Sequence, residues 1–266
     1  MNKESIFRHF STIIDNTLDN SLFFCTYWQV PWSLETITGS IDDPAVPENL
    51  HFRFGISRGC IIDDGYDYVV KFDIDGDSFS ESLCKREIEI FNDAKNYDLE
   101  AYFTEPVYIG SYCRTINFYN YEEIEKNMED WCDYDPVDFD EKFMKNEDNY
   151  GEICPITISI PLYAYPRASV YTYTYFNEED AAEYRNKVCS SKSPLRGRHT
   201  QIAMEFMFKY GEEQYNKMTK FMQEENINDI HYGNVGCLNG NLVFFDYAGW
   251  HSDYDDSYED SFEERI

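Results

Sequence analysis

Hydrophobic residues recur along this chain with two periods, and each period predicts a different kind of element. Near the N-terminus, residues 4–18 carry apolar side chains at helical spacing, which predicts an amphipathic helix (Ile6, Phe7, Phe10, Ile13, Ile14 and Leu18). Residues 30–50 are rich in Pro, Gly, Ser and Asp and predict a loop or linker. From residue 51 onward, short apolar and β-branched stretches separated by Gly and Asp turns predict strands at 51–57, 60–62, 68–74, 107–110 and 115–119. A helix is expected at 82–97.

The second half of the chain is expected to be mainly helical. Helices are predicted at 121–131, 178–189 and 200–225, the last being the longest. Alternation of Tyr with small or polar residues over 163–176 predicts a strand or hairpin, and the apolar run 242–245 predicts a strand after a Gly-Asn turn. These patterns divide the chain into four regions: 1–50, 51–120, 121–250 and an acidic tail at 251–266.

Charge limits the partners that the protein can have. The chain has 22 Lys and Arg against 51 Asp and Glu, a formal net charge of −29. Phosphate backbones and anionic membrane surfaces repel such a chain, so direct binding to nucleic acid or membrane is not expected. A host protein with a basic surface is one expected partner, and a decoy for a DNA-binding groove is another hypothesis. Residues 190–199 form a basic loop that either has a function or neutralises acidic neighbours.

Cysteine usage favours a reducing compartment. Eight cysteines are scattered without a C-x-x-C pair, and the first twenty residues lack the apolar core of a signal peptide. No apolar run approaches the roughly 18 residues that a membrane span requires. We therefore expect a soluble cytoplasmic protein with reduced, buried cysteines.

The most specific segment for chemistry is Ile227-Asn228-Asp229-Ile230-His231-Tyr232-Gly233-Asn234-Val235-Gly236, followed by Leu242-Val243-Phe244-Phe245-Asp246-Tyr247-Ala248-Gly249. Asp229 precedes Asn234 by five residues, and Asp246 closes an apolar strand twelve residues later. Phosphoryl transfer uses such groups: one carboxylate orients or accepts the proton of the attacking hydroxyl, while an amide oxygen and a second carboxylate hold magnesium. His231 is interpreted as a structural residue of the loop, with a second proton carrier as the alternative.

This segment resembles the protein-kinase-like superfamily, whose catalytic loop reads D-x-x-x-x-N and is followed by an Asp-aromatic-Gly metal motif. It is most similar to small kinase-like proteins of bacteriophages and prophages of Gram-positive bacteria, which share D-L-H-x-G-N-x-G and F-D-Y-x-G. Here Ile230 replaces the Leu, and Asp246-Tyr247-Ala248-Gly249 has one residue more than the Asp-aromatic-Gly motif.

The N-terminal half carries further parts of the same resemblance. Gly55 and Gly59 lie where a kinase-like fold has its glycine loop over the phosphates. Val69-Val70-Lys71 resembles the third strand with its phosphate-binding lysine, and sixteen residues later Glu87 resembles the helix glutamate that pairs with that lysine. Glu89 is the alternative if the register differs by two.

The resemblance implies an α+β, two-lobed protein-kinase-like fold. It has a small β-rich N-lobe and a shortened, atypical, mainly helical C-lobe. It implies ATP and Mg²⁺ as cofactors, Asp229 as base, Lys71 clamped by Glu87, and Asn234 and Asp246 as metal ligands. The acceptor is not indicated, and nucleotidylation could use the same site.

Two departures keep a second function open. The glycine loop lacks a third glycine, and only twenty residues follow Asp246, too few for the helices with which a kinase holds a peptide. The alternative is a catalytically inactive, kinase-like binding protein. Either protein would act in the cytoplasm of a bacterial host.

Overall fold

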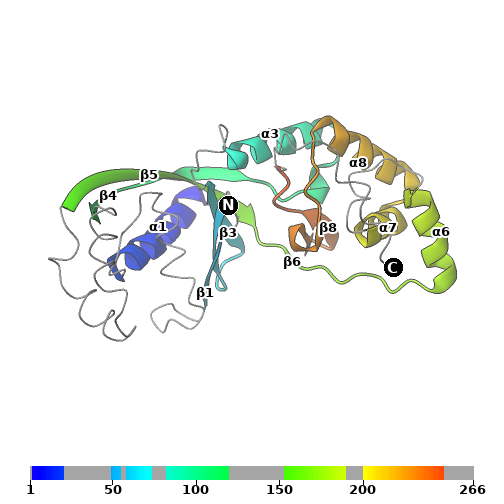
Figure 1. Ribbon diagram of the computed structural model, residues 1–266, viewed down its shortest axis with the longest axis horizontal. Coiled ribbons are helices and arrows are strands. Elements are labelled where there is room, and N and C mark those ends of the chain that lie inside the picture. Colours follow the sequence, from blue (N-terminus) through cyan, green and yellow to red (C-terminus); the bar gives the residue numbers. More distant parts are fainter. Residues whose placement is uncertain are drawn as a thin grey trace, which may run out of the picture. The chain divides into compact units, whose positions relative to one another are not determined.

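The structure is a computed structural model that describes residues 2–20, 49–54, 58–73, 82–119, 153–189 and 200–248. The fold is mixed α+β, as the sequence predicts. The chain divides into two compact units, with Met1–Ile88 and Glu105–Arg167 in unit 1 and Glu89–Thr104 and Ala168–Ile266 in unit 2. Figure 1 shows the elements of both units.

Unit 1 is built on an antiparallel sheet. Within the described residues, its five strands are ordered β1-β2-β3-β5-β4. Helix α1 (Lys3–Asn20) and the start of α3 (Leu83–Asn96) belong to the same unit. The strands are β1 (Leu50–Phe54), β2 (Arg58–Asp63), β3 (Tyr68–Asp73), β4 (Val107–Tyr119) and β5 (Ile153–Pro166).

One face of this sheet carries an apolar core with α1, which Figure 1 shows beside β4 and β5. Side chains alternate between the faces of a strand, so Val70 and Phe72 of β3 point to this face. They cluster there with Phe10 and Ile14, both fully buried on the helical stripe of α1. Burial of each such side chain stabilises the fold by about 1.5–3 kcal/mol, so α1 is an integral part of unit 1.

Polar contacts fix α1 against the same sheet. Asp63, buried at the end of β2, lies 2.8 Å from Nε2 of His9 and accepts hydrogen bonds from Asn49 and from the backbone N–H of Gly65. Burial alone would raise the pKa of Asp63, but these hydrogen bonds outweigh it and lower the pKa below its ordinary value.

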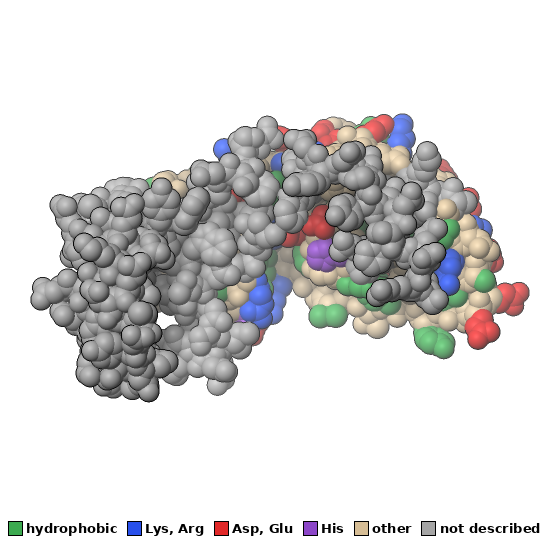
Figure 2. Space-filling view, viewed as in Figure 1, with side chains coloured by type: hydrophobic (Ala, Val, Ile, Leu, Met, Phe, Trp, Pro, Cys, Tyr) green, Lys and Arg blue, Asp and Glu red, His purple; other side chains and the backbone are tan. Residues whose placement is uncertain are grey.

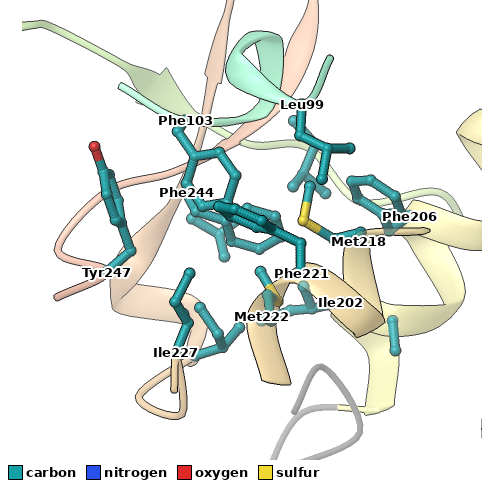
Figure 3. Close-up of a cluster of buried hydrophobic side chains, with 14 of the residues drawn as sticks. Leu99, Phe103, Ile202, Phe206, Met218, Phe221, Met222, Ile227, Phe244 and Tyr247 are labelled. Carbon is teal, nitrogen blue, oxygen red and sulfur yellow. The ribbon is translucent and has the colours of Figure 1, made fainter. Parts of the chain in front are cut away.

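Unit 2 packs helices around a small hairpin. Its elements are the part of α3 from Glu89, η1 (Glu100–Tyr102), β6 (Ser169–Val170), α6 (Glu178–Cys189), α7 (Thr200–Tyr210), α8 (Glu212–Glu224), η5 (Tyr232–Asn234), β7 (Val235–Leu238) and β8 (Asn241–Phe244). Figure 3 shows the core, in which Phe103 packs against Phe221 and Phe244, and Leu99 and Met218 belong to the same cluster. This core connects the hairpin to α7, α8 and the segment after α3.

The predicted helices at 4–18, 82–97 and 178–189 and the strands near 51, 60, 68 and 242 are confirmed. The predicted pair of strands at 107–110 and 115–119 is wrong, because β4 runs unbroken through both. Gly110, inside this strand, takes a φ of +150° at an irregularity in the pairing with β5. A Cβ there would lie 2.8 Å from the Phe7 ring of α1.

The single long helix predicted at 200–225 is also wrong. It is divided into α7 and α8 at Gly211, whose φ of +87° an L side chain rarely adopts. Apolar periodicity continues through the break because both helices bury residues in one core.

The alternation over 163–176 predicts a longer extended element than exists. β5 ends at Pro166, β6 has two residues, and Tyr171 to Asn177 are outside any strand. The buried carboxylate of Glu205 on α7 accepts hydrogen bonds from the hydroxyls of Tyr171 and Thr174. From Tyr171 onward, this segment is therefore attached to a helix and not paired as a strand.

The two units do not follow the region boundaries predicted from the sequence. β5, expected in the region 121–250, pairs with β3 and β4 in unit 1, and residues 89–104, expected in 51–120, belong to unit 2. The predicted helix at 121–131, the basic loop 190–199 and the acidic tail lie outside the described residues. In the part of the chain that the structure describes, no helix has the length and apolarity to cross a membrane.

Candidate functional site

Lys71 and Glu87 meet on the face of the unit 1 sheet opposite α1. Lys71 alternates with Val70 and Phe72 along β3 and therefore points away from the α1 core. Glu87 lies in the part of α3 that covers this second face, where Cys84 packs with the tyrosines of β5. The ammonium Nζ of Lys71 is 3.8 Å from Oε2 of Glu87. Lys71 is 7% exposed and Glu87 is fully buried, so this is an interior ion pair.

Two residues that sequence reasoning missed contact the same carboxylate. Arg58 Nη1 lies 2.8 Å from Glu87 Oε1, and the hydroxyl of Tyr165 donates a 2.6 Å hydrogen bond to Oε2. The ring of Tyr165 also contacts Lys71, whose Nζ lies 4.5 Å from the ring centroid. The Tyr alternation of 163–176 includes Tyr165, but only strand pairing shows which face it occupies.

The start of α3 is fixed to the strand that carries Lys71. Asp73, two residues after Lys71, accepts hydrogen bonds from the hydroxyl of Ser82 and the backbone N–H of Cys84. Ser82 accepts in turn from the N–H of Lys85. Together these contacts satisfy donors at the helix N-terminus that would otherwise lack partners. They set the position of Glu87 one turn further along.

Cys84 is buried beside this group of charges. Burial first, and then the nearby carboxylates of Asp73 and Glu87, raise the pKa of its thiol well above the ordinary value. The thiol is therefore protonated at neutral pH and unreactive. The described cysteines, among them the exposed Cys113 and Cys189, are free of disulfides.

The glycines expected over the phosphates are Gly55 and Gly59. Gly55 lies outside the described residues. Gly59 is on β2, buried and paired with Phe72, where a Cβ would lie 2.3 Å from the Phe72 ring. The need for glycine at 59 is thus explained by packing on the α1 face.

In unit 2, Asp229 and Asn234 lie in the loop between α8 and β7. Ile227 and Ile230 anchor this loop in the core, and Asp229 between them is exposed. The side-chain Nδ2 of the buried Asn234 donates a 2.9 Å hydrogen bond to the backbone carbonyl of Asp229. The amide NH2 group of Asn234 thus donates a hydrogen bond within the loop, and the amide oxygen is the atom suited to bind a cation.

Asp246 follows β8 and is tied to Asn234 through the backbone. The N–H of Phe245 donates to the carbonyl of Asn234, across the open end of the β7–β8 hairpin. Tyr247, on the other side of Asp246, is fully buried, and its hydroxyl donates to the carbonyl of Thr104. The hairpin therefore brings Asn234 and Asp246 to the same end of unit 2.

The backbone of Asp246 adopts a φ of +65°. Among the other described non-glycine residues with positive φ, Asp98 and Asn226 follow helix ends and Asn239 lies in the hairpin turn, where this conformation is common. Asp246 has no such position, and uncommon backbone conformations concentrate at functional sites.

His231 takes the structural role expected for it. Its Nδ1 accepts a 3.0 Å hydrogen bond from the N–H of Gly233 and so caps η5. The other ring nitrogen, Nε2, lies 3.9 Å from Oδ1 of Asp229, beyond hydrogen-bond distance.

The structure thus brings the predicted residues into two groups. Lys71 and Glu87 form one in unit 1, and Asp229, Asn234 and Asp246 form the other in unit 2. Within the described ranges, no group of three or more His, Cys, Asp or Glu residues could hold a metal ion. Asn234 and Asp246 are one amide and one carboxylate, a set that suits Mg²⁺ sharing its ligands with phosphate and water.

Neither the models of known protein families nor the curated proteins include a match to this sequence.

Proposed function

We propose that this protein is a kinase-like phosphotransferase that uses Mg-ATP. The observation that carries the proposal is the buried Lys71–Glu87 ion pair, formed between the third strand of an antiparallel sheet and the following helix. Burial of a lysine ammonium costs free energy unless an anionic group compensates its charge. A lysine that binds phosphate and is held by a glutamate on a helix has this arrangement. The Asp229–Asn234 loop followed by Asp246 supports the same proposal, because it contains the base and the metal ligands expected for phosphoryl transfer.

Each residue has one role in the proposal. Lys71 binds phosphate oxygens, and Glu87 orients the ammonium. Asn234 and Asp246 hold magnesium, which neutralises charge on the phosphates. Asp229, exposed at the tip of its loop, accepts the proton of the attacking hydroxyl.

Replacement of Asp246 tests the metal role. Asp246→Asn is expected to weaken magnesium-dependent ATP binding by about tenfold or more, because a charged ligand to a divalent cation contributes more than a neutral amide does. Calorimetric titration with ATP at fixed magnesium measures this loss. Asp98→Asn is the matched control, since Asp98 is another described aspartate with positive φ and is exposed at the end of α3.

The outcome that would reject the metal role is equal magnesium-dependent ATP affinity in Asp246→Asn and the unmodified protein. If ATP is bound, labels on its γ- and α-phosphates distinguish phosphoryl from nucleotidyl transfer. A γ-label in the acceptor indicates phosphorylation, and an α-label indicates nucleotidylation.

The net charge of −29 favours a second candidate function, that of an inactive kinase-like protein binding a basic partner. Figure 2 shows Lys and Arg side chains as well as Asp and Glu on the described surface of one face, so acidic groups do not cover that face uniformly. This function requires no nucleotide. It predicts binding to a basic partner that is unchanged by Asp229→Ala and weakened by salt.

A further inference from the structure

The carboxylate of Glu87 is shared by three groups of unit 1. Arg58 approaches Oε1 to 2.8 Å, and the Tyr165 hydroxyl donates to Oε2 at 2.6 Å. Lys71 is 3.8 Å from Oε2, longer than a hydrogen bond. Glu87 therefore contacts Arg58 and Tyr165 more closely than it contacts the lysine that it is proposed to orient.

Strand register places all three groups on one face of the sheet. Lys71 pairs with Cys60, two residues from Arg58, so Arg58 lies diagonally across from Lys71. Val69, two residues before Lys71, pairs with Tyr165 on the neighbouring strand. The arrangement depends on the regular β2-β3-β5 pairing and not on a flexible loop.

Tyr165 contacts both members of the ion pair. Its hydroxyl binds Glu87, and its ring lies beside the Lys71 ammonium at 4.5 Å from centroid to Nζ. Contact between an ammonium and an aromatic face is attractive and directional. Glu87 thus holds Lys71 by charge, and the Tyr165 ring limits where the ammonium can lie.

We propose that Arg58 and Tyr165 are positioning residues that fix Glu87 and Lys71 for binding the phosphates of a nucleoside triphosphate. Arg58 holds one carboxylate oxygen, Tyr165 holds the other, and together they set the direction in which Lys71 presents its N–H groups. This inference rests on the proposed function for its ligand, and on unit 1 alone for its geometry.

Arg58 is proposed to act through Glu87, and a double-mutant cycle tests this. Arg58→Met and Glu87→Gln are each expected to weaken Mg-ATP binding by about tenfold. Arg58→Met added to Glu87→Gln should cause little further loss, because the carboxylate that Arg58 holds is already gone. Adenosine, which lacks phosphate, should bind all variants equally.

Two further variants serve as controls. Tyr165→Phe keeps the ring and removes only the hydroxyl, and it should weaken Mg-ATP binding less than Arg58→Met does. Arg167→Met removes a positive charge and an exposed ion pair with Asp64, just beyond the ends of β5 and β2, and it should leave binding unchanged. Thermal unfolding of each variant confirms that it is folded.

Equal losses from Arg58→Met with and without Glu87→Gln would overturn the inference while leaving the proposed function intact. If the unmodified protein binds no nucleotide, the proposed function fails, and the positioning is then decided by nitrogen-15 spectra of the lysine ammonium groups. The Lys71 signal, identified by its loss in Lys71→Arg, should shift in Arg58→Met and in Tyr165→Phe. An unchanged signal in both would overturn the inference.

Discussion

Glu87 is the residue on which the unit 1 site depends. It is fully buried, and its partners come from β2, β3 and β5. A buried carboxylate is tolerated only with such partners, so its loss leaves two interior cations with fewer contacts.

Lys71→Met tests whether the partner of this lysine is phosphate. The variant is expected to weaken binding of ATP by about tenfold or more and binding of adenosine hardly at all, because a charge-assisted hydrogen bond to phosphate is lost. Calorimetric titration with both ligands measures the difference. Lys85→Met, at an exposed position two residues before Glu87, is the matched control.

Equal losses of ATP and adenosine affinity in Lys71→Met would contradict the phosphate assignment. Any comparable effect of Lys85→Met would show that overall charge, and not position, determines the affinity.

The sequence predicts Lys71 and Glu87 because each lies in a short local pattern on its own element. It does not predict Arg58 or Tyr165 as their partners. Tyr165 is 78 residues beyond Glu87 in the chain, and only the pairing of β3 with β5 brings it to this face. Contacts that depend on the register between strands leave no pattern in the local sequence.

At the scale of elements, two errors in the predicted helices and strands lie at glycines. Gly110 lies in an unbroken but irregular strand where a pair of strands was predicted, and Gly211 breaks the single helix predicted at 200–225. Glycine permits several backbone conformations, so its presence alone does not select one. The strands near 51 and 68 were predicted well, because polar and aromatic residues alternate in β1 and β3 contains the β-branched Val69 and Val70.

Gly59→Ala separates packing from ligand binding at β2. The added methyl meets the Phe72 ring at 2.3 Å, so we expect a loss of about 1–3 kcal/mol in the free energy of unfolding. Urea unfolding measures it. Gly65→Ala is the control, because its Cβ finds only an ordinary 3.4 Å contact with Asp63. Unchanged stability of Gly59→Ala together with lost ATP binding would favour a phosphate-cradling role instead.

Attachment of α1 to the sheet should depend on pH through Asp63. The pKa of Asp63 is lowered in the folded state, so its contribution to stability is present above about pH 4, the unfolded value, and is lost as pH falls through the folded-state pKa. Asp63→Asn should therefore destabilise the protein more at pH 7 than at pH 3. Urea unfolding at both pH values checks this.

Asp67→Asn is the control for that pH dependence, because Asp67 is exposed in the same turn between β2 and β3. If Asp63→Asn cost the same stability at both pH values, the contacts with His9 and Asn49 would not be those of an ionised carboxylate.

At the scale of the whole molecule, the sequence predicts the mixed α+β composition but not how the chain is shared between the units. β5, from the region predicted to be mainly helical, joins the sheet of unit 1, and residues 89–104 belong with the helices of unit 2. Periodicity reports which residues are buried, not which distant segments they meet. The same limit explains why Lys71 and Glu87 were predicted to pair while their contacts with Arg58 and Tyr165 were not.

Nucleotide binding by the whole chain is the central claim. Calorimetric titration of the unmodified protein with ATP, in the presence and absence of magnesium, tests it most directly. We expect ATP binding that is at least about tenfold tighter with magnesium, because the proposed function has Asn234 and Asp246 bind the nucleotide through the metal. Absence of binding under both conditions would contradict the proposed function, and equal affinity under both would contradict the metal site.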